Sequence, residues 1–269
     1  MKPDSALLIV GHGSTENPDS SYPTYLHALT LRRQGCFGEV QCCFWKEQPS
    51  MREVLYAIES DEVYIVPNFI SEGYFTQQII PRELELTGPV TRRGNRILKY
   101  CQPVGNHSKM SALLLNRARE IAAGVPPERS SLVIVGHGTH FNENSSKAAQ
   151  RQVEHLQRET DYAEVLNLYM EESPHVADWE TLTSCENVIV VPFFIADGLH
   201  SYQDIPVLLG VEGSPGVAAS QREYFRKNPH RIKNRLLYYS GAIGTDPLMA
   251  DVILDQVVAF DAAHETLLA

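Results

Sequence analysis

Two stretches of the sequence, DEVYIVPNFISEGYFTQQIIP at Asp61–Pro81 and ENVIVVPFFIADGLHSYQDIP at Glu186–Pro206, lie 125 positions apart. They are identical at 9 of 21 positions, where average composition predicts about one. The same offset relates GHGS at Gly11–Ser14 to GHGT at Gly136–Thr139. Such self-similarity indicates an internal duplication, so the chain consists of two related halves.

The boundary between the halves follows from their registers. The segment around Tyr100 returns around Tyr239, 139 positions later, so the second copy holds about 14 extra residues. Between the copies, GVPPER at 124–129 has the composition of a linker. We therefore expect domains at residues 1–126 and 127–269.

Short apolar runs rich in β-branched residues alternate with helical patterns in both copies. The expected strands are Leu7–Val10, Val40–Phe44, Val63–Val66 and Ile97–Tyr100, then Leu132–Val135, Val165–Tyr169, Val188–Val191 and Leu236–Tyr239. Such alternation is typical of parallel sheets covered on both faces. We predict the α/β class, with two similar domains that are each a small parallel sheet flanked by helices.

Composition excludes several classes of protein. The 269 residues carry 23 Lys and Arg against 33 Asp and Glu, a net charge of −10, which disfavours nucleic acid and anionic membranes as partners. The first apolar run, Ala6–Val10, is too short for a signal peptide or a membrane span. Five cysteines without a C-x-x-C pair indicate a reduced, cytoplasmic protein.

Metal-ligand side chains follow three successive strands of the second copy. His137 follows the first strand, Glu172 the second and His200 the third. In open parallel sheets, ligands bind beyond the carboxyl ends of the strands, where these three positions converge. Two imidazoles and one carboxylate suit a divalent first-row metal such as Co²⁺, Fe²⁺ or Ni²⁺. The second copy is therefore predicted to carry a metal site.

The first copy has an incomplete set of these ligands. It keeps His12 and Glu47, but Phe75 aligns with His200. We expect His12 to be a relic or a wall of the substrate cleft. Two further histidines near the second set, His140 and His175, are expected to face solvent.

Together, these motifs resemble the sirohydrochlorin chelatases of the CbiX type, which are class II chelatases. The resemblance covers roughly residues 6–122 and 131–260. It implies two α/β halves around a cleft in which a divalent metal, cobalt or iron, is inserted into sirohydrochlorin without ATP. Such a lyase serves sirohaem or cobalamin biosynthesis. The resemblance also implies that His137, His200 and Glu172 are the catalytic and metal-binding residues.

The long, fused form of this family carries both halves in one chain, so we expect a monomer. The His- and Cys-rich tail of some long members is absent from this sequence. We therefore predict no iron–sulfur cluster, and no cofactor-binding residue beyond those that hold the substrate metal.

The resemblance suggests a mechanism. His137 and His200 would present the metal and take up the two pyrrole protons, and Glu172 would ligate or relay a proton. Sirohydrochlorin carries eight carboxylates, and Arg suits carboxylate recognition. Candidate basic clusters are Arg222, Arg226, Lys227, Arg231, Lys233 and Arg235 in the second copy, and Arg92, Arg93, Arg96 and Lys99 in the first.

Two other hypotheses come from different classes. A non-catalytic protein that binds a metal or tetrapyrrole is suggested by Phe75, and the complete set in the second copy argues against it. A phosphoryl-transfer site would need an Arg cradle or a Gly-rich phosphate loop beside the histidine, and the sequence has neither.

Overall fold

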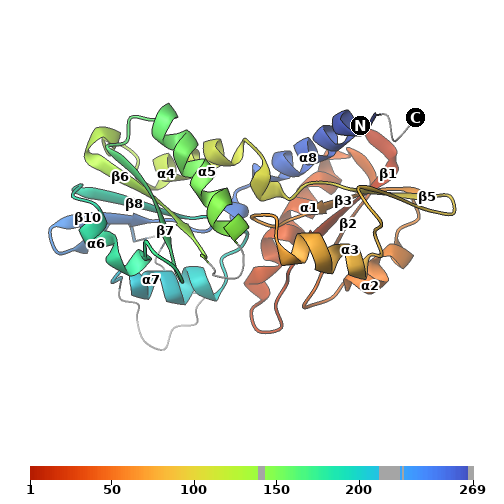
Figure 1. Cartoon of the computed structure of the whole chain (residues 1–269), viewed down its shortest axis with the longest axis horizontal. Helices are drawn as coiled ribbons and strands as arrows, with labels where there is room; N and C mark the ends of the chain where they lie inside the picture. Colours follow the sequence, from red (N-terminus) through yellow and green to blue (C-terminus); the bar gives the residue numbers. More distant parts are fainter. Residues whose placement is uncertain (139–142, 212–224, 226, 266–269) are drawn as a thin grey trace. The chain divides into compact units, whose positions relative to one another are not determined.

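All eight expected strands form, in two separate sheets of the computed structural model, which describes residues 1–138, 143–211, 225 and 227–265. Each sheet has five strands and belongs to its own compact unit. The unit around the first sheet contains residues 1–107 and 247–269, and the second contains residues 108–246 (Figure 1).

The first sheet has the strand order β2-β1-β3-β5-β4, in which only the edge strand β4 is antiparallel. Its elements are β1 Lys2–Gly11, η1 Pro18–Ser20, α1 Tyr22–Gln34, β2 Phe37–Phe44, α2 Met51–Val54, η2 Leu55–Ala57, β3 Glu62–Pro67, η3 Phe75–Ile79, α3 Ile80–Glu83, β4 Val90–Arg93, β5 Arg96–Tyr100, η4 Val104–Asn106 and α8 Met249–Ala263.

The second sheet repeats this topology with the order β7-β6-β8-β10-β9, again with an antiparallel edge strand. Its elements are α4 Met110–Ile121, η5 Pro127–Arg129, β6 Ser130–Gly136, α5 Glu143–Glu159, β7 Glu164–Tyr169, η6 Val176–Asp178, α6 Trp179–Leu182, β8 Asn187–Pro192, η7 His200–Asp204, α7 Ile205–Leu208, β9 His230–Ile232, β10 Arg235–Tyr239 and η9 Ile243–Thr245.

The α/β prediction is confirmed, but the two edge strands β4 and β9 were not expected. Each is short and joins the next strand through a two-residue hairpin turn. Gly94 in the first turn and Lys233 in the second have φ values of 58° and 51°. Two-residue hairpin turns require residues with positive φ, so the Gly94-Asn95 pair could have been used to predict the first hairpin.

The compact units do not follow the expected boundary between residues 126 and 127. Helix α4 ends the first sequence repeat but packs against β8 and α5 of the second sheet. Helix α8 ends the second repeat but packs against β3 and α1 of the first sheet, where Figure 1 shows it in blue beside red and orange strands. The two repeats thus exchange their last helices, and the division at 126 and 127 stays a prediction for the sequence repeats.

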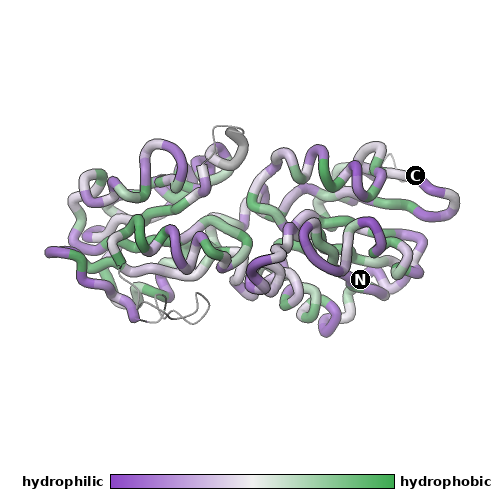
Figure 2. Tube along the Cα trace, turned by 90° about the horizontal axis from the view of Figure 1, so that it is seen from below, coloured by the Kyte–Doolittle hydropathy of each residue, from purple (hydrophilic) through white to green (hydrophobic). Residues whose placement is uncertain are grey.

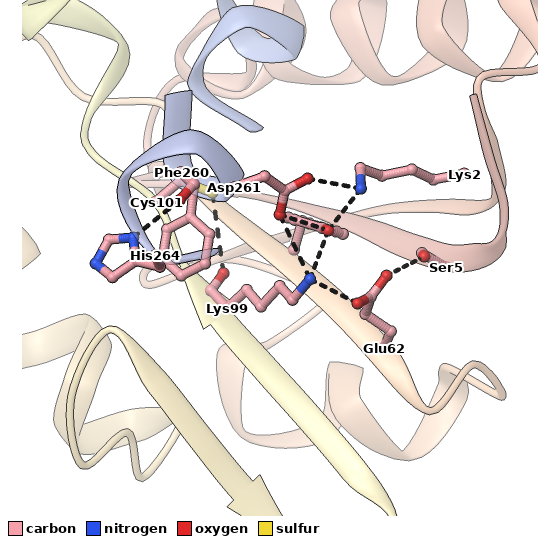
Figure 3. A network of polar contacts seen from close by, with 9 residues as sticks. Lys2, Ser5, Glu62, Lys99, Cys101, Phe260, Asp261 and His264 are labelled. Carbon is pink, nitrogen blue, oxygen red and sulfur yellow. Dashed lines mark hydrogen bonds and ion pairs between the residues drawn. The ribbon is translucent and has the colours of Figure 1, made fainter. Parts of the chain in front are cut away.

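A network of polar side chains fixes α8 on the first sheet (Figure 3). Lys2 and Asp261 form an ion pair of 2.7 Å, and the buried Lys99 reaches Glu62 at 2.6 Å. The Tyr64 hydroxyl donates to Asp261 at 2.8 Å. Burial opposes ionisation of Asp261, but hydrogen bonds from Lys2 and Tyr64 outweigh it and lower the pKa of this carboxyl.

The equivalent positions in the other half hold no such network. An offset of 139 places Tyr238 where the first sheet has Lys99, and Ala122 of the first repeat where α8 has Asp261. Of the two last helices, α8 carries a carboxylate at this position and α4 does not, so the network distinguishes α8 from α4.

The cores of both units are the apolar faces of their central strands. Residues 6–10 of β1 and 132–135 of β6 are fully buried, and the tube of Figure 2 is green along the strands inside each unit. Trp179 fills the second core, and its indole N–H donates to the Leu209 carbonyl. In the described part of the chain, no helix combines the length and apolar character needed to cross a membrane.

Candidate active site

The two GHG turns leave β1 and β6 in the same conformation. Gly13 and Gly138 both have φ of 68°, a left-handed value that favours glycine. A Cβ on Gly138 would lie 2.7 Å from Cγ of Glu172 and 2.8 Å from Cβ of Tyr169. Only glycine fits there, because the turn packs directly on the end of β7.

The turn also determines which ring nitrogen of His137 carries the hydrogen. Its Nδ1 lies 2.9 Å from the carbonyl oxygen of Gly138. A carbonyl oxygen only accepts, so Nδ1 carries the hydrogen and Nε2 keeps its lone pair. His12 makes the same contact with Gly13 at 2.8 Å. Each turn therefore presents an Nε2 that is able to bind a metal ion or a proton.

His200 begins η7, a single π-helical turn beyond the carboxyl end of β8. Such turns are frequent at functional sites. Its Nδ1 lies 2.6 Å from Oδ2 of Asp204, four residues on. The carboxylate holds the hydrogen on Nδ1, so the Nε2 of His200 also keeps its lone pair.

The structure brings His137 and His200 together. Their ring centroids are 5.0 Å apart, at an interplanar angle of 83°. Both side chains are partly open to solvent, 36 % for His137 and 44 % for His200. Phe194 lies beside both rings, at 6.4 Å and 6.0 Å. The result is an accessible imidazole pair with an aromatic wall.

Glu172, the third expected ligand, lies beneath the GHG turn. Its carboxylate accepts a hydrogen bond from the Ser146 hydroxyl. Burial, together with the charge of Glu172, raises the pKa of the neighbouring Tyr169. A cavity of about 520 Å³ opens here, lined by Ser146, Lys147, Gln150, Asn167, Tyr169, Glu172, Ser173 and Pro174.

The carboxylate next to the imidazoles is instead that of Glu171, whose Oε1 lies 3.7 Å from Nε2 of His137. Within the described ranges, no three or more His, Cys, Asp and Glu side chains are grouped closely enough to hold a metal ion. The arrangement is therefore an open imidazole pair flanked by negative charge. A metal bound there would keep positions free for other donors.

The first repeat carries a different chemistry on the same frame. Phe75 begins η3, as His200 begins η7, and its ring centroid lies 4.6 Å from that of His12. Glu47 accepts a hydrogen bond from the Ser14 amide at 3.1 Å. His12 thus faces an aromatic ring where His137 faces a second imidazole.

Two arginines of the basic clusters lie at the edge of the sheets opposite to the one expected for carboxylate recognition. Arg96 begins β5, and its guanidinium donates to the carbonyls of Leu55 and Ile58 at 2.7 Å. Arg235 begins β10 and donates to the Glu180 carbonyl at 3.0 Å. Both therefore sit at amino ends of strands and serve the fold, whereas the histidines follow carboxyl ends.

Other cluster members have similar structural partners. Arg93 donates to the Leu84 carbonyl, and Lys99 belongs to the α8 network. Arg222 and Arg226 lie outside the described residues, as does His140, whereas His175 is exposed as expected.

Sequence reasoning missed Glu171 and Asp204. Glu171 directly precedes Glu172, and only the twist of the chain at the end of β7 decides which of them reaches His137. Asp204 lies four residues after His200, a helical spacing that brings two side chains together. The contact between Asp204 and His200 could therefore have been predicted from this spacing.

A duplicated α/β frame whose second copy exposes a pair of imidazoles beyond the carboxyl ends of its strands is typical of proteins that handle a divalent metal ion. The particular family follows from comparison with known proteins. The chain belongs to the CbiX family, whose model matches it twice, over residues 6–121 and 131–259. The expected resemblance is confirmed.

Individual relatives agree with this assignment. The chain is 41 % identical over 269 residues to a probable sirohydrochlorin cobaltochelatase of Halobacterium salinarum, covering 93 % of this chain and 90 % of that one. A multi-domain protein of Deinococcus radiodurans with structural similarity to chelatases superimposes with a TM-score of 0.78 at 26 % identity. The match covers 94 % of this chain but 54 % of that longer one.

The same fold is found in SirB of Bacillus subtilis. The structure with Fe³⁺ gives a TM-score of 0.73 at 18 % identity, and the structure of the sirohydrochlorin chelatase SirB with cobalt gives 0.69 at 17 %. Each match covers 99 % of this chain and 98 % of the other.

Proposed function

We propose that this protein is a chelatase that inserts a divalent metal ion into sirohydrochlorin without ATP, in sirohaem or cobalamin biosynthesis. The observation that carries the proposal is the pair His137 and His200, 5.0 Å apart, with the lone pair of Nε2 left available on both rings. Membership of the CbiX family and the Halobacterium relative support the same activity.

The metal substrate is proposed to be Co²⁺ or Fe²⁺, with Ni²⁺ as a further candidate. Imidazole nitrogen binds all three ions, so the donor set favours late first-row metals without selecting among them. The names of the relatives support cobalt and iron, since one is a probable cobaltochelatase and SirB holds either Fe³⁺ or cobalt.

Insertion exchanges one divalent ion for two protons on the pyrrole nitrogens. In our proposal, Nε2 of His137 and of His200 hold the incoming ion, with Glu171 adding negative charge beside it. As the ion passes to the macrocycle, each freed Nε2 becomes a base for one of the two protons. Glu172 would ligate or relay a proton from its place beneath the turn.

We further propose that the enzyme is a cytoplasmic monomer that needs no nucleic acid, membrane or iron–sulfur cluster. The five cysteines are all free thiols, which suits a reducing compartment. The two sheets that a dimer of half-length chains would supply are present in one chain.

The test is anaerobic absorbance of sirohydrochlorin mixed with Co²⁺ or Fe²⁺. We compare the wild type with His137→Ala, His200→Ala and His12→Ala. Acceleration over the spontaneous rate should vanish in the first two variants and persist in the third, because only the second repeat has the imidazole pair.

If the wild type binds sirohydrochlorin but accelerates insertion of none of Co²⁺, Fe²⁺ and Ni²⁺, the enzyme hypothesis fails. The non-catalytic binding protein would then take its place. Equal losses of insertion activity in all three variants would contradict the assignment of the site to the second repeat.

A further inference from the structure

The first repeat differs from the second at the positions that surround the imidazole pair. An offset of 125 places Phe75 where the second repeat has His200, and Ile79 where it has Asp204. The same offset places Trp45 on Met170 and Tyr74 on Leu199. Both members of the His200–Asp204 contact are therefore replaced by apolar residues.

Three aromatic replacements lie together with Phe69, which aligns with Phe194 of the second repeat. We call these four side chains the aromatic platform: Trp45, Phe69, Tyr74 and Phe75. Phe75 lies at its centre, with centroid distances of 6.5 Å to Trp45, 5.9 Å to Phe69 and 5.8 Å to Tyr74. Phe69 and Phe75 are stacked, 21° from parallel.

The aromatic platform is partly open to solvent, and two of its rings, Trp45 and Phe69, also pack against the core of the first unit. The Tyr74 side chain is exposed, and the other three rings are partly exposed. Aromatic rings clustered at a surface indicate a binding site, because a ligand that covers them removes apolar area from water. The rings follow the carboxyl ends of β2 and β3, where ligands of α/β sheets bind.

The charge beside the rings is also reversed. Lys46 stands at the position of Glu171, which lies next to His137 in the second repeat. The guanidinium carbon of Arg82 lies 5.9 Å from the centroid of the Trp45 ring. Arg82 also forms an ion pair with Glu83 at 2.8 Å, so Lys46 is the charge that distinguishes this surface from the second repeat. Aromatic rings with a lysine beside them suit a planar anion.

We propose that the aromatic platform binds the conjugated macrocycle of the tetrapyrrole through its ring face, with Lys46 meeting a peripheral carboxylate. The proposal rests on the proposed function, since sirohydrochlorin is a flat, conjugated polyanion. The first repeat then supplies binding energy for the tetrapyrrole.

The test exchanges residues between the repeats. The variant Trp45→Met/Lys46→Glu/Tyr74→Leu carries residues that the second repeat already accommodates at the equivalent positions. We measure anaerobic equilibrium binding of metal-free sirohydrochlorin by absorbance titration, together with KM and kcat for cobalt insertion. Kd and KM should both rise about tenfold or more, because each lost stacking contact weakens binding of a flat ring system.

Tyr56→Leu is the matched control. Tyr56 is 91 % exposed and lies on η2, before the amino end of β3, so its replacement should leave Kd unchanged. Circular dichroism and thermal unfolding of each variant identify a fold defect. Lys46→Glu alone separates charge from stacking, and we expect its effect on Kd to shrink at high salt.

The outcomes separate the two proposals. If the wild type binds sirohydrochlorin and the folded triple variant binds it equally well, the platform proposal is overturned while the chelatase proposal stands. If the wild type neither binds nor metallates sirohydrochlorin, the proposed function fails and the platform proposal fails with it.

Discussion

The two repeats share one backbone fold but carry different side chains beyond the carboxyl ends of their strands. In the second, His137 faces His200, and Glu171 stands beside them. In the first, His12 faces Phe75 under an identical glycine turn. The backbone is repeated down to the π-helical turns η3 and η7, so the side chains alone make the difference.

This contrast shows that one backbone frame can carry two different sets of side chains, and our proposals assign a different task to each set. A metal ion is attracted by lone pairs and negative charge, whereas a polycarboxylate macrocycle is repelled by that charge. Two copies of one frame can meet both requirements without compromise. The following predictions test how far the chemistry is confined to the second repeat.

The largest effect should come from giving the second repeat the side chain of the first. His200→Phe removes one Nε2 but keeps an aromatic ring beside His137 and Phe194. We expect cobalt insertion to fall by about 100-fold or more, the range for loss of a positioned acid–base group. Initial rates at saturating sirohydrochlorin measure this, with His12→Phe as the matched control. A comparable fall in the control would contradict the assignment to the second repeat.

The next effect should come from Asp204, which positions His200 through the 2.6 Å contact. Asp204→Ala frees the imidazole to rotate and to change tautomer, so Co²⁺ affinity and insertion rate should drop about 10-fold to 100-fold. Titration with Co²⁺, followed by its visible absorption bands, gives the affinity. Asp204→Asn retains an acceptor for the Nδ1 hydrogen and should recover part of the loss; no recovery would argue against a positioning role.

A gain of function should follow from the reverse exchange in the first repeat. Lys46→Glu/Phe75→His introduces the second imidazole and the neighbouring negative charge. We expect the chain to bind two equivalents of Co²⁺ instead of one, the new site about tenfold weaker, because its supporting contacts have not been tuned. Equilibrium dialysis with metal analysis measures the stoichiometry, and an unchanged value would show that the frames are not interchangeable.

The smallest effect concerns acid stability, which should differ between the units because only the first contains the α8 network. The lowered pKa of Asp261 stabilises the folded state above its ordinary value of 3.8, and this contribution is lost as the pH falls through the folded-state pKa. Asp261→Asn should therefore destabilise the protein by about 1 kcal/mol at neutral pH and flatten the decline below pH 4.

Hydrogen exchange followed by mass spectrometry resolves this difference along the chain. Amides of α8 should lose protection in acid before those of α4. Asp251→Asn, on an exposed face of the same helix, is the control. Equal behaviour of the two helices would show that the network contributes little to docking.

Much of this architecture could be predicted from local sequence. The repeat, the eight central strands and the placement of His137 and His200 near each other follow from apolar runs and from the convergence of strand ends. The position of the arginines could also have been predicted. Arg96 and Arg235 open their strands, so they had to lie at the edge opposite the histidines.

The remainder depends on contacts between residues far apart in the chain. Local periodicity makes α4 and α8 helices but does not say which sheet each one covers. That choice rests on pairs such as Lys99 with Asp261, 162 positions apart. Similarly, composition cannot tell whether Glu171 or Glu172 turns toward His137, because that depends on the direction in which the chain leaves β7.

The exchanged helices have a consequence for how this chain could be divided. If residues 1–126 and 127–269 were expressed as separate fragments, each would carry the helix that packs on the sheet of the other fragment. We therefore expect the two fragments to fold stably only when they are mixed. Residues 108–246, by contrast, form one contiguous unit. Lys2 and Asp261 bring β1 and α8 together, so a circular permutant opened between His107 and Ser108 would place the two compact units one after the other along the chain.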